Sequence, residues 1–370
     1  MEVVSDCSLP VASLVWRPTA ASWMLTVVCK GTFVRKGAEL VLADRQESPT
    51  PADAHWDDDR QRSLRAATDL VPSKPRVDVV LVGHAYAPPG TAVRRLTARL
   101  AVAEIDKVVE IVADPQSSAS FDRMPLVYER AAASPALNPV GVLESGTANL
   151  RLVRSSLAKQ DAVAAFGPVS PSWPWRHSRR GSFSPGGFDF RTQPLPPDLD
   201  TSHFNHAPPD QQLERLPPHT RFLLENLDRN APRVEFELPA LRPWLVIERG
   251  GTYVEGETAE ELPLMRCDTV TIDTDRAIVS LTWRIQVPLD GLDDAGRAIV
   301  SLDPLRSSRV AAAAQKRPSP PPPPWPPPSV TGLPFRKPAP GDVPAPPPSW
   351  APPAPPPSAA PTSSVRMPRN

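Results

Sequence analysis

The segment from His203 to Gln211, H-F-N-H-A-P-P-D-Q, holds the densest group of functional side chains in the sequence. Its two histidines, His203 and His206, stand three residues apart, and Asp210 follows them. On a helix, histidines at this spacing share one face and can bind zinc together with a carboxylate. The Pro-Pro pair inside the segment prevents a helix from continuing, however. We therefore expect a coil whose polar side chains bond to backbone groups that no sheet pairs.

His84 is a second candidate for chemistry, in G-H-A-Y-A-P at the end of an apolar run. A histidine there could act as a general base, but at a strand end it is more often a hydrogen-bond donor of the core. The sequence contains neither the G-x-S-x-G pattern of a serine nucleophile nor the glycine-rich loops that hold nucleotide phosphates. One enzymatic alternative stays open, a metal-dependent hydrolase centred on His84, His203, His206 and Asp210.

The formal charge of the chain is balanced, with 41 Lys and Arg residues against 41 Asp and Glu residues. A basic cluster, R-H-S-R-R at residues 176–180, could bind phosphate. One cluster in a neutral chain is usually a solvated loop, however. We therefore expect no nucleic-acid partner.

The three cysteines, Cys7, Cys29 and Cys267, are far apart and predict neither a disulfide framework nor a zinc site. The first ten residues lack the charged start and apolar core of a signal peptide. No run reaches the ~20 apolar residues that span a bilayer. The expected protein is cytoplasmic, does not insert into a membrane and needs no cofactor.

Several segments have the composition and alternation of β-strands. The clearest are residues 23–35, 39–42, 76–88, 93–102, 108–112, 121–130, 222–227, 234–238, 244–248 and 267–285. In residues 93–102, period-two alternation places Arg99 on the polar side of the strand. Pro125 places its own segment at a sheet edge because proline lacks a backbone donor.

Residues 131–218 have a different texture, with little periodicity and much proline, glycine and aromatic residue. A loop of this length is either disordered or functional. Its tryptophans, Trp173 and Trp175, favour an ordered coil pinned onto the sheets. Within it, residues 131–136 and 150–165 are expected to form short helical turns.

Proline is concentrated at the C-terminus, where 23 of the 52 prolines fall between Pro318 and Pro368. Such a segment cannot pack a core and is expected to be extended and disordered. The sequence thus predicts a mainly β protein with two packed antiparallel sheet regions joined by a long ordered proline- and aromatic-rich coil. The expected divisions are an N-terminal β region at 1–130, the coil at 131–218, a second β region at 219–305 and the disordered proline-rich tail at 306–370.

Six motifs follow one another in the chain. They are G-H-A-Y-A-P (83–88), F-D-R-M-P-L-V-Y-E-R (121–130), N-P-V-G (138–141), F-G-P-V-S-P-S-W (166–173), H-F-N-H-A-P-P-D-Q (203–211) and L-E-N-L (224–227). In this order they resemble a bacterial domain-of-unknown-function family encoded beside type VI secretion spike and PAAR-repeat proteins. The resemblance covers roughly residues 11–288.

The resemblance implies that the motif residues fix a coil or present a binding surface. These residues are His84, Tyr86, Met124, Pro125, Tyr128, Glu129, Arg130, Asn138, Pro139, Gly167, Pro168, Trp173, Phe204, Asn205, Pro208, Asp210, Gln211, Glu225 and Asn226. The chain departs from the family pattern where E-R-A-A-A-S replaces E-R-A-F-G-G, and at His206, where the family usually has a small residue. The second departure argues against a metal-binding pair of His203 and His206.

The function that the resemblance implies is that of a non-enzymatic adaptor or chaperone. It would bind a type VI effector, a PAAR-repeat protein or a spike protein and assist its loading. Trp173 and Trp175 are expected to act as aromatic anchors for this protein partner. Two alternatives remain, the hydrolase named above and a structural component that stays in the assembled apparatus.

Overall fold

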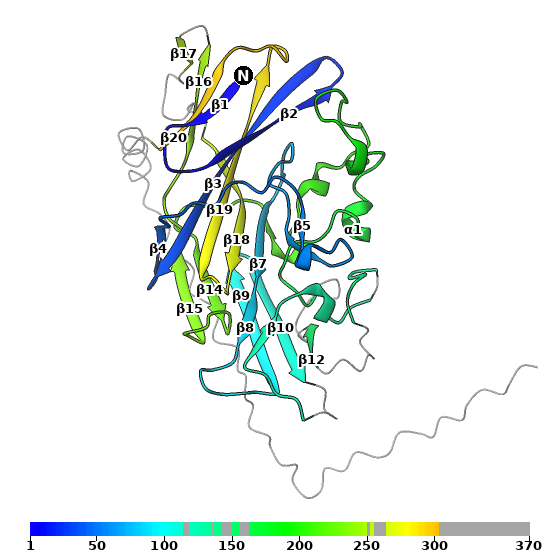
Figure 1. The fold of residues 1–370 in the computed structure, drawn as a ribbon, viewed down its shortest axis with the longest axis vertical. Coiled ribbons are helices and arrows are strands. Elements are labelled where there is room, and N and C mark those ends of the chain that lie inside the picture. The colour runs from blue at the N-terminus through cyan, green and yellow to red at the C-terminus, as the bar shows by residue number, and fades with distance from the viewer. Residues whose placement is uncertain are drawn as a thin grey trace, which may run out of the picture. The chain divides into compact units, whose positions relative to one another are not determined.

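The computed structural model describes residues 1–113, 118–134, 136–142, 150–154, 163–249, 252–254 and 264–302. All of them belong to one compact unit, and the expected proline-rich tail lies outside the described residues. The described chain is mainly β, as the sequence predicted (Figure 1). Within it, no helix combines the length and apolarity that a membrane crossing requires.

The largest sheet has seven strands and joins segments from both ends of the chain. Its strands, in spatial order, are β13 (Gln212–Leu213), β7 (Val77–Val82), β18 (Arg266–Asp273), β19 (Ile278–Leu289), β3 (Ser22–Lys36) and β2 (Val11–Thr19), with β4 (Glu39–Leu42) also paired to β3. The strands β3 and β4, which match the segments 23–35 and 39–42 predicted from sequence, pair as an antiparallel hairpin. The prediction of a purely antiparallel sheet was wrong here, because β7 and β18 run parallel.

A five-stranded sheet completes the core. Its strands, in spatial order, are β12 (Leu150–Arg154), β10 (Ile105–Ala113), β9 (Arg95–Val102), β14 (Arg221–Glu225) and β15 (Arg233–Glu237). The prediction of helical turns was wrong for β12, where Leu152 is buried and pairs with Ile111. Burial against a neighbouring strand thus outweighs local helical preference.

The remaining elements are short. A four-stranded sheet contains β1 (Glu2–Ser5), β20 (Arg297–Ser301), β16 (Trp244–Arg249) and β17 (Thr252–Val254). Two-stranded sheets pair β8 (His84–Tyr86) with β11 (Arg123–Pro125), and β5 (Ala54–His55) with β6 (Leu64–Ala66). The helical turns are α1 (Pro174–His177) and 3-10 turns at Trp56–Asp58, Tyr128–Arg130, Pro185–Gly187, Thr201–Phe204 and Pro209–Gln211. The strand expected over 121–130 is therefore limited to β11, and a helical turn follows it.

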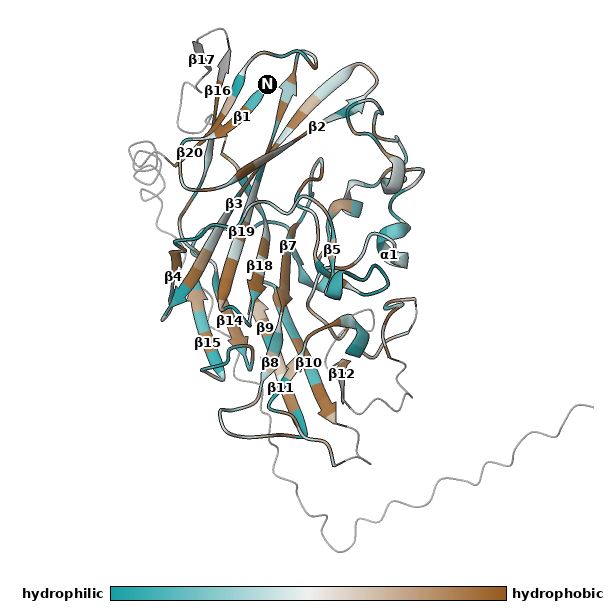
Figure 2. Ribbon diagram, in the orientation of Figure 1, coloured by the Kyte–Doolittle hydropathy of each residue, from teal (hydrophilic) through white to brown (hydrophobic). Residues whose placement is uncertain are grey.

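The two large sheets share one hydrophobic core. On β7 the core side chains are Val77, Val79 and Leu81, and Figure 2 shows the hydrophobic character of this strand. Alternation in β9 contributes Leu100 in the same way. Arg99, expected on the polar side of its strand, is only 2% exposed, and its guanidinium is bound by Asp106 at 2.7 Å.

Candidate functional site

The face of the large sheet that points away from this core is polar. Cross-strand pairing aligns four of its residues in one row, Asp78 with Thr269, Thr269 with Thr282, and Thr282 with Lys30. The register of the same strands fixes the next row, because alternate residues of a strand share a face. That row consists of Val80, Thr271, Ser280 and Thr32.

Residues 43–76, between β4 and β7, cross this polar face (Figure 1). Their middle part, residues 54–66, contains the β5–β6 hairpin and is called the flap here. Glu129 fixes the flap to the body of the protein, because its carboxylate accepts hydrogen bonds from Ser63, at 2.6 Å from N–H and 2.9 Å from the hydroxyl. This motif residue therefore has a structural partner that the sequence did not indicate.

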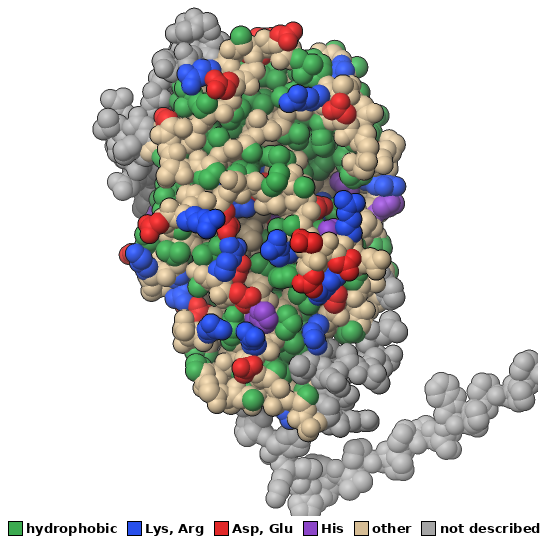
Figure 3. All heavy atoms as spheres, in the orientation of Figure 1, with side chains coloured by type: hydrophobic (Ala, Val, Ile, Leu, Met, Phe, Trp, Pro, Cys, Tyr) green, Lys and Arg blue, Asp and Glu red, His purple; other side chains and the backbone are tan. Residues whose placement is uncertain are grey.

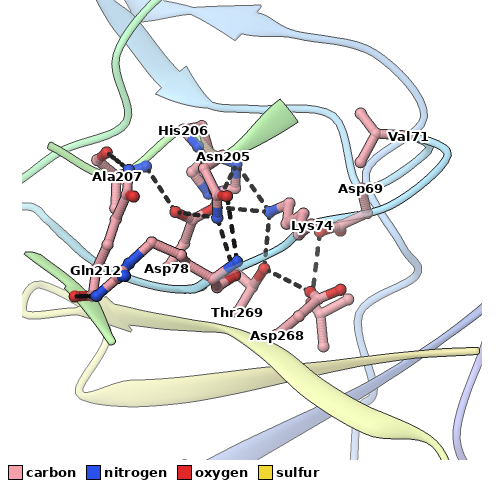
Figure 4. Close-up of polar contacts among 12 residues, drawn as sticks. Asp69, Val71, Lys74, Asp78, Asn205, His206, Ala207, Gln212, Asp268 and Thr269 are labelled. Atoms are coloured by element: carbon pink, nitrogen blue, oxygen red, sulfur yellow. Dashed lines mark hydrogen bonds and ion pairs between the residues drawn. The ribbon is translucent and has the colours of Figure 1, made fainter. Parts of the chain in front are cut away.

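Lys74 lies at the centre of the buried polar layer beneath residues 43–76 (Figure 4). Its ammonium has three N–H groups, and each has an acceptor. These acceptors are Asp78 Oδ2 at 3.0 Å, His206 Nδ1 at 3.0 Å and Thr269 Oγ1 at 2.8 Å. A buried ammonium is stable only when it is paired and bonded in this way.

Asp78 is equally saturated. Its Oδ1 accepts from Asn205 Nδ2 at 3.0 Å and from the Ala207 N–H at 3.1 Å. Its Oδ2 accepts from the His206 N–H at 3.0 Å and from Lys74. Burial would raise the pKa of Asp78, but the Lys74 ammonium and these donors hold the pKa below its usual range. The F-N-H-A part of the motif thus binds the buried Asp78 carboxylate through three hydrogen bonds.

His206 is neutral in this layer. Burial, followed by the charge of Lys74, lowers the pKa of His206 to about 3. Because Lys74 can only donate, Nδ1 of His206 is the acceptor and Nε2 carries the proton. The imidazole is a structural hydrogen-bond acceptor here.

Two further buried ion pairs extend the layer. Lys30 contacts Asp69 at 3.1 Å, and the Thr50 N–H donates to the same carboxylate at 2.8 Å. Arg284 contacts Asp268 at 2.6 Å. Residues 43–76 are therefore held to the sheet by charge pairs at Asp69 and Lys74, and Arg284 also donates to the Val71 carbonyl at 2.9 Å.

The C-terminal end of the H-F-N-H-A-P-P-D-Q motif is fixed to the core by Gln211. Its Nε2 donates to the carbonyls of Val79 at 2.7 Å and Phe166 at 2.9 Å. Its Oε1 accepts from Lys107 Nζ at 2.7 Å, and Lys107 also contacts Asp210 at 3.0 Å. Burial lowers the pKa of Lys107, although Asp210 opposes this.

His203 belongs to a different environment. Its Nδ1 lies 2.9 Å from the Arg176 carbonyl, and Arg176 in turn donates to the His203 carbonyl. Its ring contacts Phe183 and Phe204 at centroid distances of 5.7 Å. Burial lowers the pKa of His203. Arg176, from the basic cluster, is thus buried and does not form a surface patch.

Tyr128 and Asn138 hold the first part of the coil. The Tyr128 hydroxyl donates to the Gly167 carbonyl at 2.8 Å, and Asn138 Nδ2 donates to the Tyr128 carbonyl at 2.8 Å. Trp173 packs edge-on against Tyr128 at 4.8 Å and is 5% exposed. The expectation that Trp173 faces a partner was therefore wrong, because its ring is part of the core. Trp175 is half-buried.

The remaining motif residues have varied positions. Asn226, at a positive φ of 57°, donates to the Thr97 carbonyl at 2.8 Å. Glu225 contacts Arg99 and Arg233. Met124, Phe204 and Pro208 are buried, whereas Pro139 is exposed.

His84 and Tyr86 converge on Asp275, in the turn after β18. His84 Nδ1 lies 2.9 Å from both carboxylate oxygens, and the Tyr86 hydroxyl donates to Oδ1 at 2.6 Å. Thr274 Oγ1 accepts from the His84 N–H at 2.7 Å. Gly83 has a φ of +106°, and a Cβ there would lie 2.4 Å from Thr274 Oγ1. The G-H-A-Y motif thus requires glycine at its first position.

A cleft lies between the flap and the polar face of the sheet, with a volume of about 530 Å³. A second hollow of about 380 Å³ shares Trp56 and Gly83 with it and also contains His84 and Glu129. We call the two together the flap cleft. Figure 3 shows side chains of both charges over the lower half of the face drawn in that view. The motif residues expected to form a coil or binding surface that line the flap cleft are His84, Pro125, Glu129, Arg130 and Pro168, and His206 lines it as well.

The four residues of the hydrolase alternative have separate partners. His84 is bound to Asp275, His203 to a backbone carbonyl, His206 to Lys74, and Asp210 to Lys107. Across the described residues, no three His, Cys, Asp or Glu side chains are placed to hold one metal ion. The geometry therefore brings together a structural network at His206 and a separate His–Asp–Tyr cluster at His84.

Sequence reasoning missed the charged residues that the motif residues contact or that extend the buried polar layer. They are Lys30, Asp69, Lys74, Asp78, Lys107 and Asp275. One signal was present, because Asp78 interrupts the apolar run R-V-D-V-V-L-V. A carboxylate in a buried strand requires a partner.

Comparison with known proteins gave one match. The model of the family DUF2169, described as an uncharacterized protein conserved in bacteria, matches residues 20–284. No curated protein and no solved structure is similar enough to match.

Proposed function

We propose that this chain, which belongs to the DUF2169 family of uncharacterized proteins conserved in bacteria, is a non-enzymatic adaptor. It binds a type VI secretion effector, a PAAR-repeat protein or a spike protein in the cytoplasm and assists its loading. The class of partner comes from the ordered motifs, which resemble a family encoded beside such proteins.

One observation carries the binding role. Internal hydrogen bonds use the side-chain amides of Asn205 and Gln211 and the backbone N–H and Nδ1 of His206, so these motif residues build a rigid support. Above that support, the flap cleft stays open to a partner. A site that is already organised loses less conformational entropy when it binds.

The flap gives the cleft its second wall. Trp56 lies at the point where the two hollows meet and is half-buried. Large aromatic side chains of this kind dominate the binding energy of many protein interfaces. In the proposed mechanism, a segment of the partner enters the flap cleft and packs against Trp56.

The experiment is co-purification of the tagged full chain with each spike, PAAR-repeat and effector protein encoded beside it. We expect at least one to be recovered, and we expect Trp56→Ala to reduce recovery at least fivefold. Trp175→Ala is the matched control, because Trp175 is also half-buried but does not line the flap cleft. Recovery of no neighbour would refute the function, and equal loss in both variants would refute the flap cleft as its site.

A further inference from the structure

The floor of the flap cleft contains a buried ammonium with a spare donor. Lys30 donates to Thr50 Oγ1 at 3.2 Å and to Asp69 Oδ2 at 3.1 Å. Its third N–H has no acceptor among the described residues. Because Lys30 lines the cleft and is 8% exposed, this donor is available to a molecule that enters.

Other donors surround it. His206 lines the cleft, and its Nε2 carries a proton because Nδ1 accepts from Lys74. The hydroxyls of Thr271 and Ser280 also line the cleft, and in the described part of the chain neither has a hydrogen-bond partner. Donors on the wall of a cleft that have no partner within the protein favour an occupant that brings acceptors.

The carboxylates that line the two hollows of the cleft are already bonded within the protein, so they compete little for a cation from outside. Asp69 accepts from Lys30, Glu47 and Asp273 accept from Arg276, and Asp275 accepts from His84 and Tyr86. In the second hollow, Asp57 accepts from Arg62 and Glu129 accepts from Ser63.

Arg65 is different from the other cations of the cleft. It lies in β6 on the flap, lines the cleft and is exposed. No described residue forms an ion pair or hydrogen bond with its guanidinium. The arginine guanidinium donates two parallel hydrogen bonds to a carboxylate, which makes it a specific binding site for acidic groups.

We propose that the flap cleft binds an acidic, extended peptide segment of the protein partner, with Arg65 at the rim and Lys30 and the His206 Nε2–H on the floor as donors to its carboxylates. This inference rests on the proposed function and specifies the chemistry of the partner. A peptide also supplies backbone carbonyls, which match the hydroxyls of Thr271 and Ser280.

The test measures fluorescence anisotropy of the full chain with a fluorescein-labelled decapeptide of alternating Ser and Glu. The same peptide with Gln in place of Glu is the neutral probe. Arg65→Glu is compared with Arg60→Glu, which makes the same charge change on the flap at an exposed residue outside the cleft. Thr271→Val removes a floor hydroxyl without changing charge, and circular dichroism verifies that each variant is folded.

We expect Arg65→Glu to weaken binding of the acidic peptide at least about tenfold and Arg60→Glu to weaken it less than about twofold. Thr271→Val should weaken binding about threefold, and the neutral peptide should bind at least tenfold more weakly than the acidic one. Equal effects at the two arginines would overturn the proposal. Free glutarate that binds as tightly as the acidic peptide would also overturn it, by identifying a site for small carboxylates.

The outcome can be separated from that of the proposed function. If a neighbouring protein co-purifies equally with the wild type and Arg65→Glu, the adaptor role stands and the acidic-segment proposal fails. If no neighbour is recovered but the peptide distinguishes Arg65 from Arg60, the binding site stands and the adaptor role fails.

Discussion

Lys74 and Asp78 form an ion pair of 3.0 Å in which neither side chain has any exposed area. They stand four residues apart, where the segment that crosses the sheet enters β7. Their other bonds extend to His206 and Thr269, so one pair joins three parts of the chain. The pair is therefore the centre of the buried polar layer.

Removal of one partner should be costly. In Asp78→Asn, the Lys74 charge loses its counterion, and the new amide N–H₂ faces donors. We expect the free energy of unfolding to fall by about 3 to 5 kcal/mol. Urea denaturation followed by circular dichroism measures this change. Arg95→Ala removes an ion pair to Glu110 at an arginine that is 73% exposed, and should cost less than about 1 kcal/mol. Similar losses in both variants would contradict the structural role of the buried pair.

His206 should make the stability depend on pH. Its pKa is about 3 in the folded protein against 6.5 in the unfolded chain, so only the unfolded chain gains the proton between these values. Stability is therefore complete above pH 6.5 and is lost as the pH falls toward 3, by at most about 1.4 kcal/mol per pH unit from this group.

The check is a series of urea denaturations between pH 4 and 7. The slope of the free energy of unfolding against pH gives the number of protons taken up on unfolding. We expect His206→Gln to lower this number by about one relative to the wild type, although the variant is also less stable at pH 7. His177→Gln, at an exposed position, should leave the dependence unchanged. An unchanged slope in His206→Gln would show that another group controls it.

Gly83 should not tolerate a side chain. Its φ is +106°, and a Cβ would lie 2.4 Å from Thr274 Oγ1, which also accepts from the His84 N–H. We expect Gly83→Ala to cost about 1 to 3 kcal/mol, measured as a lower melting temperature. Gly186→Ala has nothing within 4 Å of its Cβ and should stay within about 0.5 kcal/mol of the wild type. Equal melting temperatures would refute the close approach at Gly83.

The Tyr128 hydroxyl should contribute more to the free energy of unfolding than the Tyr86 hydroxyl does. Tyr128→Phe leaves the buried Gly167 carbonyl without its donor, at an expected cost of about 1 to 3 kcal/mol. Tyr86→Phe removes a bond to Asp275, whose side chain is 40% exposed, so water can replace it. Chemical denaturation should therefore rank Tyr128→Phe as the less stable variant, and the reverse order would contradict this assignment.

The strands were predictable to the extent that they are encoded locally. Alternation and β-branched residues identified β3 and β4, because these signals need only adjacent residues. The polar network was not predictable, because its bonds join residues 132 positions apart between Lys74 and His206 and 195 positions apart between Lys74 and Thr269. The alternation within one segment does not indicate which of its residues will pair with a strand far away in the sequence. For the same reason the burial of Arg99 was not predicted, since its partners Asp106 and Glu225 lie on two other strands.

The parallel pairing of β7 with β18 has a consequence for how the protein is made. Thr269, which completes the bonds of Lys74, is synthesised 195 residues later. At about 5 to 20 residues per second, a ribosome needs roughly 10 to 40 s to reach it. The first half of the chain therefore cannot complete its central sheet during that time. Folding of this unit is expected to be late and slow, because non-local strand pairs raise the contact order.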